Sequence, residues 1–415
     1  MTPPPLTRAV SPLDGLTIGP REFVALMAAI FGLQALGIDV MLPALEQIGE
    51  YYQRANPNDQ QLVIFAFVLG FGFPQLVFGP ISDRYGRKVL LQLSLVGYAV
   101  FGFLCMFAPT FESLLAFRLA QGVCCSGTRV SAGAIIRDVS AGRSMAKVLS
   151  LVYTIFMIVP IIAPALGTAI MVQAGWEWTF GVLGVFAVVL LVWISLRLPA
   201  TMKEARPINL SAILDGFSRV LKHRTSFGYM CASGIIFGAL FAFIAASEQV
   251  FDEVFGRGEL FWAYFAGIAG LLAVTNYSNS RVVEKLGMRR IGHAMVLIFI
   301  AVSALNLFIM QVFGQPFWPF YVLFCIAFAC FGMMGANFAS LALEPMGDIA
   351  GTANAVYGFF TMTGSSLIGI FIARQFDGSV VPILWGYVGL GLVSLSIILV
   401  TERGRLFGVG EAYDG

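Results

Sequence analysis

Gly79-Pro-Ile-Ser-Asp-Arg-Tyr-Gly-Arg-Lys88 is the stretch of sequence that decides the fold of this chain. It lies between two long apolar runs, roughly 61–80 and 89–109. A dense cluster of cations is costly inside hydrocarbon, so we expect a short loop at a membrane surface. A second stretch, Glu284-Lys-Leu-Gly-Met-Arg-Arg290, repeats the order acid, base, apolar residue, Gly and terminal bases 201 positions later (284 − 83). Two copies of one loop predict an internal repeat.

The composition is that of an integral membrane protein. Of the 415 residues, 58% are hydrophobic and 12% are charged, and the mean hydropathy is +0.85. Soluble domains carry about 25% charged residues. A helix that crosses about 30 Å of hydrocarbon needs about 20 residues. We count twelve apolar runs of that kind, at roughly 22–45, 61–80, 89–109, 112–136, 146–172, 176–197, 227–250, 260–280, 290–312, 317–343, 349–373 and 380–401.

The distribution of Lys and Arg predicts the orientation in the membrane. With the N-terminus in the cytoplasm, the cytoplasmic loops and tails hold 20 of the 25 Lys and Arg, and the opposite side holds only Arg54, Arg257 and Arg374. Cytoplasmic loops carry such an excess of positive charge. We therefore expect both termini on the cytoplasmic side. The remaining two arginines, Arg118 and Arg129, lie inside the fourth run.

The longest polar linker, about 199–226, divides the chain into two halves of six helices. We expect halves at 22–198 and 227–401, with cytoplasmic tails at 1–21 and 402–415. Each copy of the repeated loop lies between the second and third helices of its half, as parallel repeats require. Apolar residues within the linker recur at helical spacing and predict an amphipathic helix on the cytoplasmic membrane surface. These residues are Ile213, Leu214, Phe217, Val220 and Leu221.

Neither a metal site nor a cofactor is expected. The six Cys all fall inside apolar runs, where free thiols behave as small apolar side chains. The two histidines, His223 in the linker and His293 at the inner start of the ninth run, belong to no catalytic arrangement. The net charge of +2 does not indicate a nucleic-acid partner. The sequence therefore does not predict an enzyme.

Asp39 and Arg118 are the charged residues that we predict to carry coupling. Asp39 lies about 17 residues, or roughly 26 Å, into the first run, in the outer part of the membrane. Arg118 lies at a similar depth, about six residues into the fourth run. An ionisable group inside the membrane is a functional candidate by default. We expect Arg118 to pair with the ionised Asp39 carboxylate and to release it when it is protonated. The alternatives are an idle, hydrated Asp39 and a fixed structural ion pair.

Arg129 follows Arg118 by 11 positions, which is three helical turns, so both arginines face the same way. A guanidinium group suits carboxylate and phosphate groups. Two interpretations remain open: Arg129 binds an anionic group of a substrate, or it pairs with an acid or with backbone carbonyls.

Several stretches resemble the motifs of one transporter family. Residues 79–88 match G-x-x-x-D-R-x-G-R-[KR] at every fixed position, 117–122 resemble R-x-x-Q-G, and 39–43 resemble D-M-Y-L-P. Pro160, Pro164 and Gly167 resemble an antiporter motif of the fifth helix, although Val159 and Ala163 stand where that motif has Gly. Arg137-Asp138 and Gly351-Thr-Ala353 add detail. Together, from about 22 to 401, the chain resembles the major facilitator superfamily, and within it the Bcr/CflA subfamily of drug:proton antiporters with twelve helices.

The resemblance implies an all-α membrane protein with twelve transmembrane helices in two pseudo-symmetric halves. It also implies a central cavity, for which other polar and aromatic residues are candidates. The alternative for the polar residues is hydrogen bonding between helices, and for the aromatic residues it is contact with lipid or with the core. These candidates are Gln34, Gln121, Tyr153, Phe237, Phe241, Glu248, Tyr264, Asn276 and Asn337. A cytoplasmic latch is implied between Asp83 and the start of the eleventh helix, formed while the outer side is open. Its residues are Gly79, Asp83, Arg84, Gly86, Arg87, Lys88 and Gly351.

We therefore expect a proton-coupled exporter of small amphipathic molecules in a bacterial inner membrane, working by alternating access. The expected partners are a small-molecule substrate and the lipid bilayer, the expected state is a monomer, and the proton is the coupling ion without any cofactor. Export of an anionic metabolite or siderophore anchored by Arg129 is an alternative, and a sensor or channel on the same scaffold is another. The sequence leaves the substrate and the choice between proton and sodium open.

Overall fold

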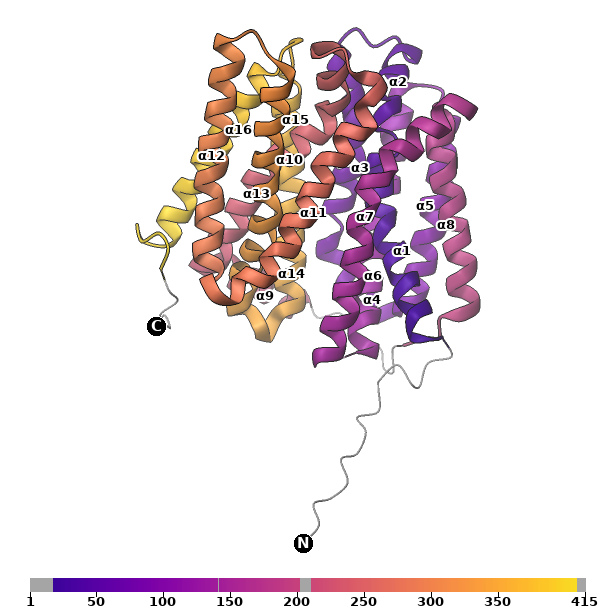
Figure 1. Cartoon of the computed structure of the whole chain (residues 1–415). Helices are drawn as coiled ribbons and strands as arrows, with labels where there is room; N and C mark the ends of the chain where they lie inside the picture. Colours follow the sequence, from indigo (N-terminus) through magenta and orange to yellow (C-terminus); the bar gives the residue numbers. More distant parts are fainter. Residues whose placement is uncertain (1–17, 141, 202–209, 409–415) are drawn as a thin grey trace.

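The computed structural model describes residues 18–140, 142–201 and 210–408, and these are almost entirely helical. The expected tails and the linker therefore lie partly outside the described residues. Figure 1 shows two bundles of long helices side by side, the N-terminal one in indigo to magenta and the C-terminal one in orange to yellow. The N-terminal bundle contains α1 (Pro20–Asp39), α2 (Leu45–Tyr51), α3 (Leu62–Gly72), α4 (Gln75–Tyr85), α5 (Arg87–Met106), α6 (Phe111–Val139), α7 (Gly142–Ala174) and α8 (Glu177–Arg197).

The C-terminal bundle follows the linker helix α9 (Leu210–Lys222). It contains α10 (Arg224–Gln249), α11 (Phe261–Leu286), α12 (Met288–Val312), α13 (Phe317–Leu343), α14 (Ala350–Phe359), α15 (Ser365–Ala373) and α16 (Val381–Thr401). Short helical turns join these helices: η2 (Leu42–Ala44), η3 (Pro57–Gln61), η4 (Val250–Val254), η5 (Gly258–Leu260), η6 (Glu344–Ile349) and η7 (Phe360–Gly364).

All twelve predicted apolar runs are helical, and three of them are interrupted. The first run continues from α1 through η2 into α2, the second bends by 47° between α3 and α4, and the eleventh contains the π-helical turn η7 between α14 and α15. In the described residues, nine helices are long and apolar enough to cross a membrane, or ten if α3 and α4 form one span. Helix α6 falls outside that set, since it carries Arg118, Gln121 and Arg129 along its length. The prediction of an all-helical membrane protein with twelve helices is confirmed.

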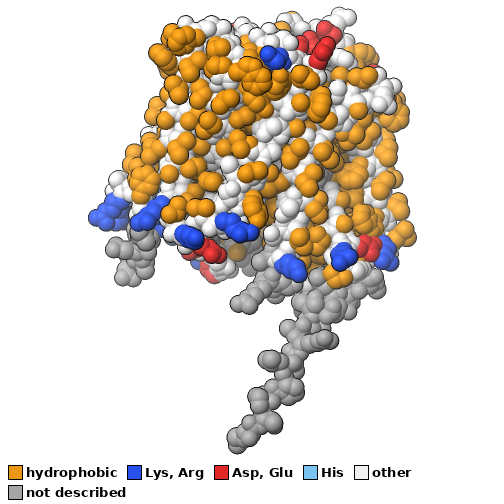
Figure 2. Space-filling view, in the orientation of Figure 1, with side chains coloured by type: hydrophobic (Ala, Val, Ile, Leu, Met, Phe, Trp, Pro, Cys, Tyr) orange, Lys and Arg blue, Asp and Glu red, His pale blue; other side chains and the backbone are white. Residues whose placement is uncertain are grey.

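The surface separates into an apolar belt and a basic edge. Figure 2 shows hydrophobic side chains over most of the visible face and a row of Lys and Arg along its lower edge. This edge lies on the side at which α1 begins in Figure 1, as the positive-inside rule requires if that side faces the cytoplasm.

The repeated loop has the same backbone turn in both copies. Gly86, between α4 and α5, has φ +100°, and Gly287, between α11 and α12, has φ +82°. The two glycines are 201 positions apart (287 − 86), the spacing that the sequence pattern gave. Residues with a Cβ rarely adopt this conformation, so the glycine of each copy permits the sharp turn.

The linker helix α9 exists, but its apolar face does not lie only against the membrane. Arg219 donates to Asp348 Oδ2 at 2.6 Å, which ties α9 to the turn η6 before α14. Val220 is buried, and Ile213 and Phe217 contribute to the wall of a cavity described below. Leu214 remains exposed. The linker is thus packed against the C-terminal half.

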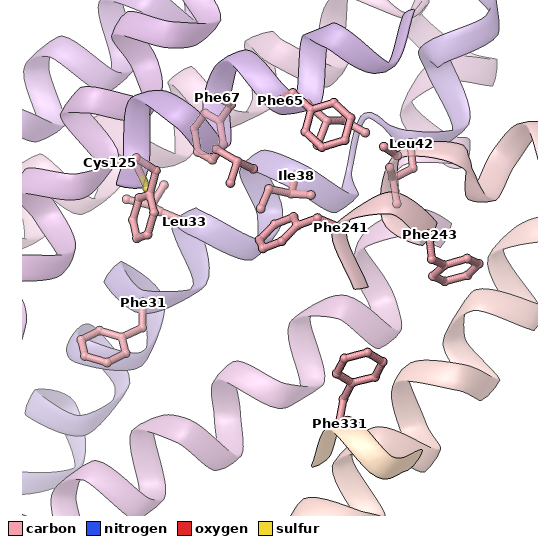
Figure 3. Packing of buried hydrophobic residues seen from close by; sticks show 14 of the residues in the cluster. Phe31, Leu33, Ile38, Leu42, Phe65, Phe67, Cys125, Phe241, Phe243 and Phe331 are labelled. Atoms are coloured by element: carbon pink, nitrogen blue, oxygen red, sulfur yellow. The ribbon is translucent and has the colours of Figure 1, made fainter. Parts of the chain in front are cut away.

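On the outer side, polar side chains close the two halves against each other. Gln61 Nε2, at the end of η3, donates to Gln249 Oε1 of α10 at 2.7 Å. Asn58 Nδ2 donates to the carbonyl of Phe376 at 2.8 Å, and Arg374 forms an ion pair with Asp59 at 3.0 Å. Figure 3 shows apolar packing between the two halves, where the ring of Phe241 on α10 points toward Ile38 of α1. The outer side is closed in this structure.

Glycines allow the helices of the N-terminal half to approach closely. A Cβ at Gly122 of α6 would overlap the carbonyl oxygen of Phe67 on α3, and a Cβ at Gly70 of α3 would overlap that of Leu119. Small residues at membrane helix interfaces permit such backbone contact. The two glycines therefore hold α6, with its buried charges, directly against α3.

We predict that Gly122→Ala destabilises the protein by about 1–3 kcal/mol, because the added methyl group overlaps backbone that cannot move away without separating the helices. Gly133→Ala on the same helix is the matched control, since no atom lies within 4 Å of its Cβ position. Replacing a glycine inside a helix at an open position stabilises by roughly 0.5–1 kcal/mol. Thermal unfolding of both purified variants measures the two effects. Equal unfolding temperatures would show that the contact at Gly122 is not tight.

Candidate functional site

A cavity of about 800 Å³ lies between the two halves. Phe31 and Gln34 of α1, Arg129 of α6 and Tyr153 of α7 form its wall on the N-terminal side, and Met362 of η7 faces them from the C-terminal half. The wall extends down to the cytoplasmic ends of the helices, where it includes Asp83, Arg137, Asp348 and Gly351. Since the outer side is closed, the cavity is accessible from the cytoplasmic side.

The outer end of the cavity is covered by contacts between α1, α3 and η7. Gln34 Nε2 lies 3.7 Å from Met362 Sδ. A Cβ at Gly72 of α3 would overlap Thr363 of η7, so the two backbones approach closely there. A π-helical turn inside an α-helix frequently occurs at functional sites. Here it brings the C-terminal half against the end of α3.

Arg118 is fully buried and lies outward of this cavity. Its guanidinium donates to the carbonyl of Gly37 on α1 at 2.7 Å, to the carbonyl of Val63 on α3 at 3.2 Å, and to Gln121 Oε1 at 2.7 Å. The rings of Phe67 and Phe180 lie 4.4 and 5.5 Å from its central carbon. Arg118 therefore connects four helices. Within the described residues it forms no ion pair with an acid.

Asp39 is buried with an exposed fraction of 4%. In the part of the chain that the structure describes, its carboxyl group has no hydrogen-bond or ion-pair partner. The expected pair with Arg118 is absent in this conformation, although Arg118 holds Gly37, which lies two residues before Asp39. A buried, ionised carboxylate without a partner is strongly unfavourable. The pairing of the two residues thus stays a prediction for another state of the cycle.

The helix-five motif lies directly against the end of α1. A Cβ at Gly167 of α7 would overlap the carbonyl of Val40, the residue after Asp39. Pro160 and Pro164 lie inside α7 without ending it. The contact brings the backbone of α7 next to the position of Asp39, which connects the two motifs in space.

Arg129 lies in the cavity among aromatic rings. Its central guanidinium carbon is 3.6 Å from the centre of the Phe31 ring, 5.6 Å from that of Tyr153 and 5.9 Å from that of Phe156. Nη2 is 3.5 Å from the Tyr153 hydroxyl, and Nη1 is buried without a hydrogen-bond partner. No acid of the described chain pairs with Arg129. The sequence left two roles open for Arg129, binding of an anionic substrate group or pairing within the protein. In this conformation, pairing with an acid is not seen among the described residues.

The other cavity candidates lie outside the lining of this cavity. Gln121 is engaged by Arg118, and Asn337 donates to Asn279 Oδ1 at 2.8 Å and to the carbonyl of Met333 at 2.7 Å. The backbone of Asn276 packs against Gly332. Asn337 therefore joins α13 to α11, which was the alternative explanation for it, whereas the partner of Gln121 lies on its own helix α6.

The aromatic candidates of the C-terminal half also contact protein. Phe237 packs edge-on against Phe331, Phe241 lies in the buried apolar cluster, and Tyr264 accepts a hydrogen bond from Arg257 at 2.9 Å. Glu248 lies near the outer surface beside other acids. Of the nine residues expected beside Arg129, the cavity of this conformation brings together Gln34 and Tyr153.

The cytoplasmic loop motif forms a network within the N-terminal half. Arg87 Nη2 donates to Asp83 at 3.0 Å and Nη1 to the carbonyl of Ala134 at 2.8 Å, and Nε forms an ion pair with Asp138 at 2.9 Å. Lys88 donates to the carbonyl of Ser195 at 3.3 Å, whereas Arg84 is exposed.

The expected latch is not formed in this conformation. Asp83, Gly79 and Gly351 all line the open cavity, and Asp83 pairs with Arg87 rather than with the start of α14. A latch that forms while the outer side is open would be released in this state. Its closing contact therefore stays a prediction.

Sequence reasoning missed the polar layer that closes the outer side. Nothing in the sequence shows that three polar residues near helix ends contact one another. These residues are Asn58, Gln61 and Gln249. The one available signal was Arg374, which is among the few cations on the outer side. Phe156, in the surroundings of Arg129, was also not singled out.

Comparison with known proteins agrees with this architecture. The Major Facilitator Superfamily profile matches residues 24–370. An uncharacterized MFS-type transporter of Bacillus subtilis, YdgK, is 30% identical over 83% of this chain and 86% of its own length. The bicyclomycin resistance protein homolog of Haemophilus influenzae is 26% identical, and the multidrug resistance protein MdtL of Escherichia coli is 28% identical, each over 92% of this chain and 96% of the relative.

Solved structures share the fold at low sequence identity. A partially occluded inward-open structure of the xylose transporter XylE from Escherichia coli superposes with a TM-score of 0.71 at 13% identity, over 91% of this chain and 98% of that one. A bacterial homolog of the human lysosomal transporter Spinster superposes with a TM-score of 0.69 at 15% identity, over 92% of this chain and 96% of that one. With the profile match over most of its length, this chain is a multi-span membrane protein of the Major Facilitator Superfamily.

Proposed function

We propose that this protein exports small amphipathic molecules from the cytoplasm of a bacterium across the inner membrane in exchange for protons. The observation that carries the proposal is Asp39, a buried carboxyl group without a partner among the described residues, next to a backbone position held by the buried Arg118. The Asp39 carboxyl group can be either protonated or ionised. It lies outward of a cavity that is accessible from the cytoplasmic side.

In the proposed cycle, Asp39 carries a proton in the inward-facing state. When the proton leaves to the cytoplasm, the carboxylate needs a counter-ion, and the Arg118 guanidinium is the nearest candidate along α6. Pairing requires Arg118 to give up the carbonyl of Gly37 and to shift by about 3 Å, the rise of two helical residues. Because this bond holds α1, breaking it would free α1 to move with substrate bound. Protonation from the outside would restore it.

The cavity suits a substrate of drug-like size. Its volume of about 800 Å³ falls within the range of roughly 300–1,000 Å³ that small-molecule sites occupy. Its wall combines aromatic and aliphatic side chains, such as Phe31 and Leu76, with polar ones, among them Gln34 and Tyr153. The names of the bicyclomycin and multidrug resistance relatives support substrates of this kind. We expect the protein to act as a monomer, with the proton as coupling ion and no cofactor.

We predict that Asp39→Asn abolishes coupling, because the amide cannot take up or release a proton. In proteoliposomes with an imposed pH gradient, proton-driven accumulation of bicyclomycin or of a cationic dye should fall at least about tenfold, whereas exchange without a gradient should persist. Dependence of wild-type transport on a sodium gradient would replace the proton in this scheme.

Glu22→Gln is the matched control for Asp39→Asn. Glu22 is also an acid of α1, but it lies at the cytoplasmic end of that helix and forms an ion pair with Arg197 at 2.7 Å. Coupling should survive this change. Wild-type coupling in Asp39→Asn would disprove the role of Asp39 as proton carrier.

A second candidate function, export of an anionic compound, is favoured by the surroundings of Arg129. The two acids of the cavity wall, Asp83 and Asp348, are already paired with Arg87 and Arg219. Arg129 thus brings an unpaired positive charge into the cavity, with one buried nitrogen that has no acceptor. A carboxylate or phosphate of a substrate would supply that acceptor.

We predict that Arg129→Gln weakens binding of anionic compounds at least about tenfold and leaves that of neutral compounds within about twofold, because only the former lose a charged partner. Binding of a matched panel of anionic, neutral and cationic compounds to the purified variants measures this. Arg137→Gln is the control, since it removes a cation from the mouth of the same cavity. Unchanged affinity for the anionic compounds in Arg129→Gln would eliminate the second candidate.

A further inference from the structure

Three acids meet across the two halves at the outer side. Carboxylate oxygens of Glu46 on α2, Glu248 on α10 and Asp252 on the π-helical turn η4 all lie within 4.8 Å of one another. Glu46 belongs to the N-terminal half, whereas Glu248 and Asp252 belong to the C-terminal half. Figure 2 shows acidic side chains gathered at the upper edge of the molecule, opposite the basic edge. We name Glu46, Glu248 and Asp252 the outer acid cluster.

The basic residues of the outer side are bound elsewhere. Arg54 pairs with Asp59 and Glu112, and Arg374 pairs with Asp59. Arg257 donates to the Tyr264 hydroxyl and lies over the ring of Phe317 at 4.1 Å. Among the described residues, none of these arginines forms an ion pair with the outer acid cluster. Within the described part of the chain, no cation therefore neutralises the negative charges of the cluster.

The burial of Glu248 is a second observation that indicates a ligand, and it does not depend on how many acids the cluster contains. Its exposed fraction is 8%, so it is more than nine-tenths buried, and its carboxyl group has no hydrogen-bond or ion-pair partner among the described residues. A buried carboxyl group without a partner is rare, because burial without hydrogen bonds is costly. The neighbouring Gln249 is bound to Gln61, which fixes this turn of α10 and directs Glu248 into the cluster.

Asp252 is also held in position. A Cβ at Gly258 would overlap its carboxylate, so the backbone of η5 supports this side chain closely. Oxygens bound about 2.4 Å from one cation lie at most about 4.8 Å apart, and the three carboxylate oxygens of the cluster all lie within that limit. Oxygen ligands of this kind are those that Ca²⁺ and Mg²⁺ prefer.

We propose that the outer acid cluster binds a hard divalent cation, of the chemistry of Ca²⁺, from the outer side of the membrane. The cation joins Glu46 of one half to Glu248 and Asp252 of the other, so the site is complete only while the outer side is closed. Binding therefore stabilises the inward-facing state, since a ligand shifts an equilibrium toward the state that it binds better. The site is separate from the cavity and from Asp39, and it does not depend on which substrate is exported.

The test is binding of Ca²⁺ to the purified full-length protein, measured by calorimetry and by thermal unfolding. We expect a Kd of about 10⁻⁴–10⁻³ M, as in extracellular calcium modules, and a rise in unfolding temperature with Ca²⁺. Glu248→Gln and, separately, Asp252→Asn should weaken binding at least about tenfold. Glu259→Gln, which removes an exposed acid of the same outer side, is the matched control and should bind like the wild type.

A distance measurement tests the effect on the halves. Fluorescent labels on Tyr51→Cys and Leu260→Cys, in protein without its native Cys, report the separation of the two outer ends. Both positions are exposed. Saturating Ca²⁺ should shift the population toward the short distance, and Glu248→Gln should remove that shift. Absence of Ca²⁺ binding in the wild type, or equal binding by Glu248→Gln, Asp252→Asn and Glu259→Gln, would overturn the proposal. Stabilisation by acid pH alone, without Ca²⁺ binding, would assign the cluster to shared protons instead.

Discussion

The structure of the N-terminal half depends on the buried guanidinium of Arg118. Removing a cation from water costs several kcal/mol, and no acid of the described residues forms an ion pair with Arg118 to compensate it. Three hydrogen bonds, each worth about 1.5–3 kcal/mol when the donor is charged, and two aromatic rings offset this cost. Since two of the acceptors are backbone carbonyls of α1 and α3, the same charge that must be satisfied also fixes the positions of these helices. A change in the charge of Asp39 would compete for this guanidinium.

The two sides of the membrane use different interactions between the halves. The outer side is closed by amides, by backbone carbonyls and by the ion pair Arg374–Asp59, and these contacts form only when both halves meet. On the cytoplasmic side the charges of the loop motif are satisfied inside one half, by Arg87 with Asp83 and Asp138. The cavity opens where charges have partners within their own half, and it is closed where partners come from the other half.

Much of the fold was predictable from the sequence, because a helix that crosses hydrocarbon must be built from a long run of apolar residues. All twelve runs are helical, and the repeated glycines Gly86 and Gly287 make the same turn. The candidate site was only partly predictable. Gln34, Arg129 and Tyr153 meet in the cavity, but Gln121 and Asn337 bind other side chains. A polar residue within a membrane helix reads alike whether its partner is a neighbouring helix or a substrate.

The sequence by itself determined the helices, their orientation and the presence of charges within the membrane, since these follow from local hydropathy and from the distribution of Lys and Arg. Only the tertiary structure decided which charges have partners. The sequence places Asp39 and Arg118 at similar depth in the membrane. In this state, however, Arg118 binds the carbonyl of Gly37 and not the carboxyl group of Asp39. The contacts of Gln61 with Gln249, and of Glu46 with Glu248 and Asp252, join residues about 190 to 210 positions apart. Such contacts depend on how two rigid halves meet, which no local pattern contains.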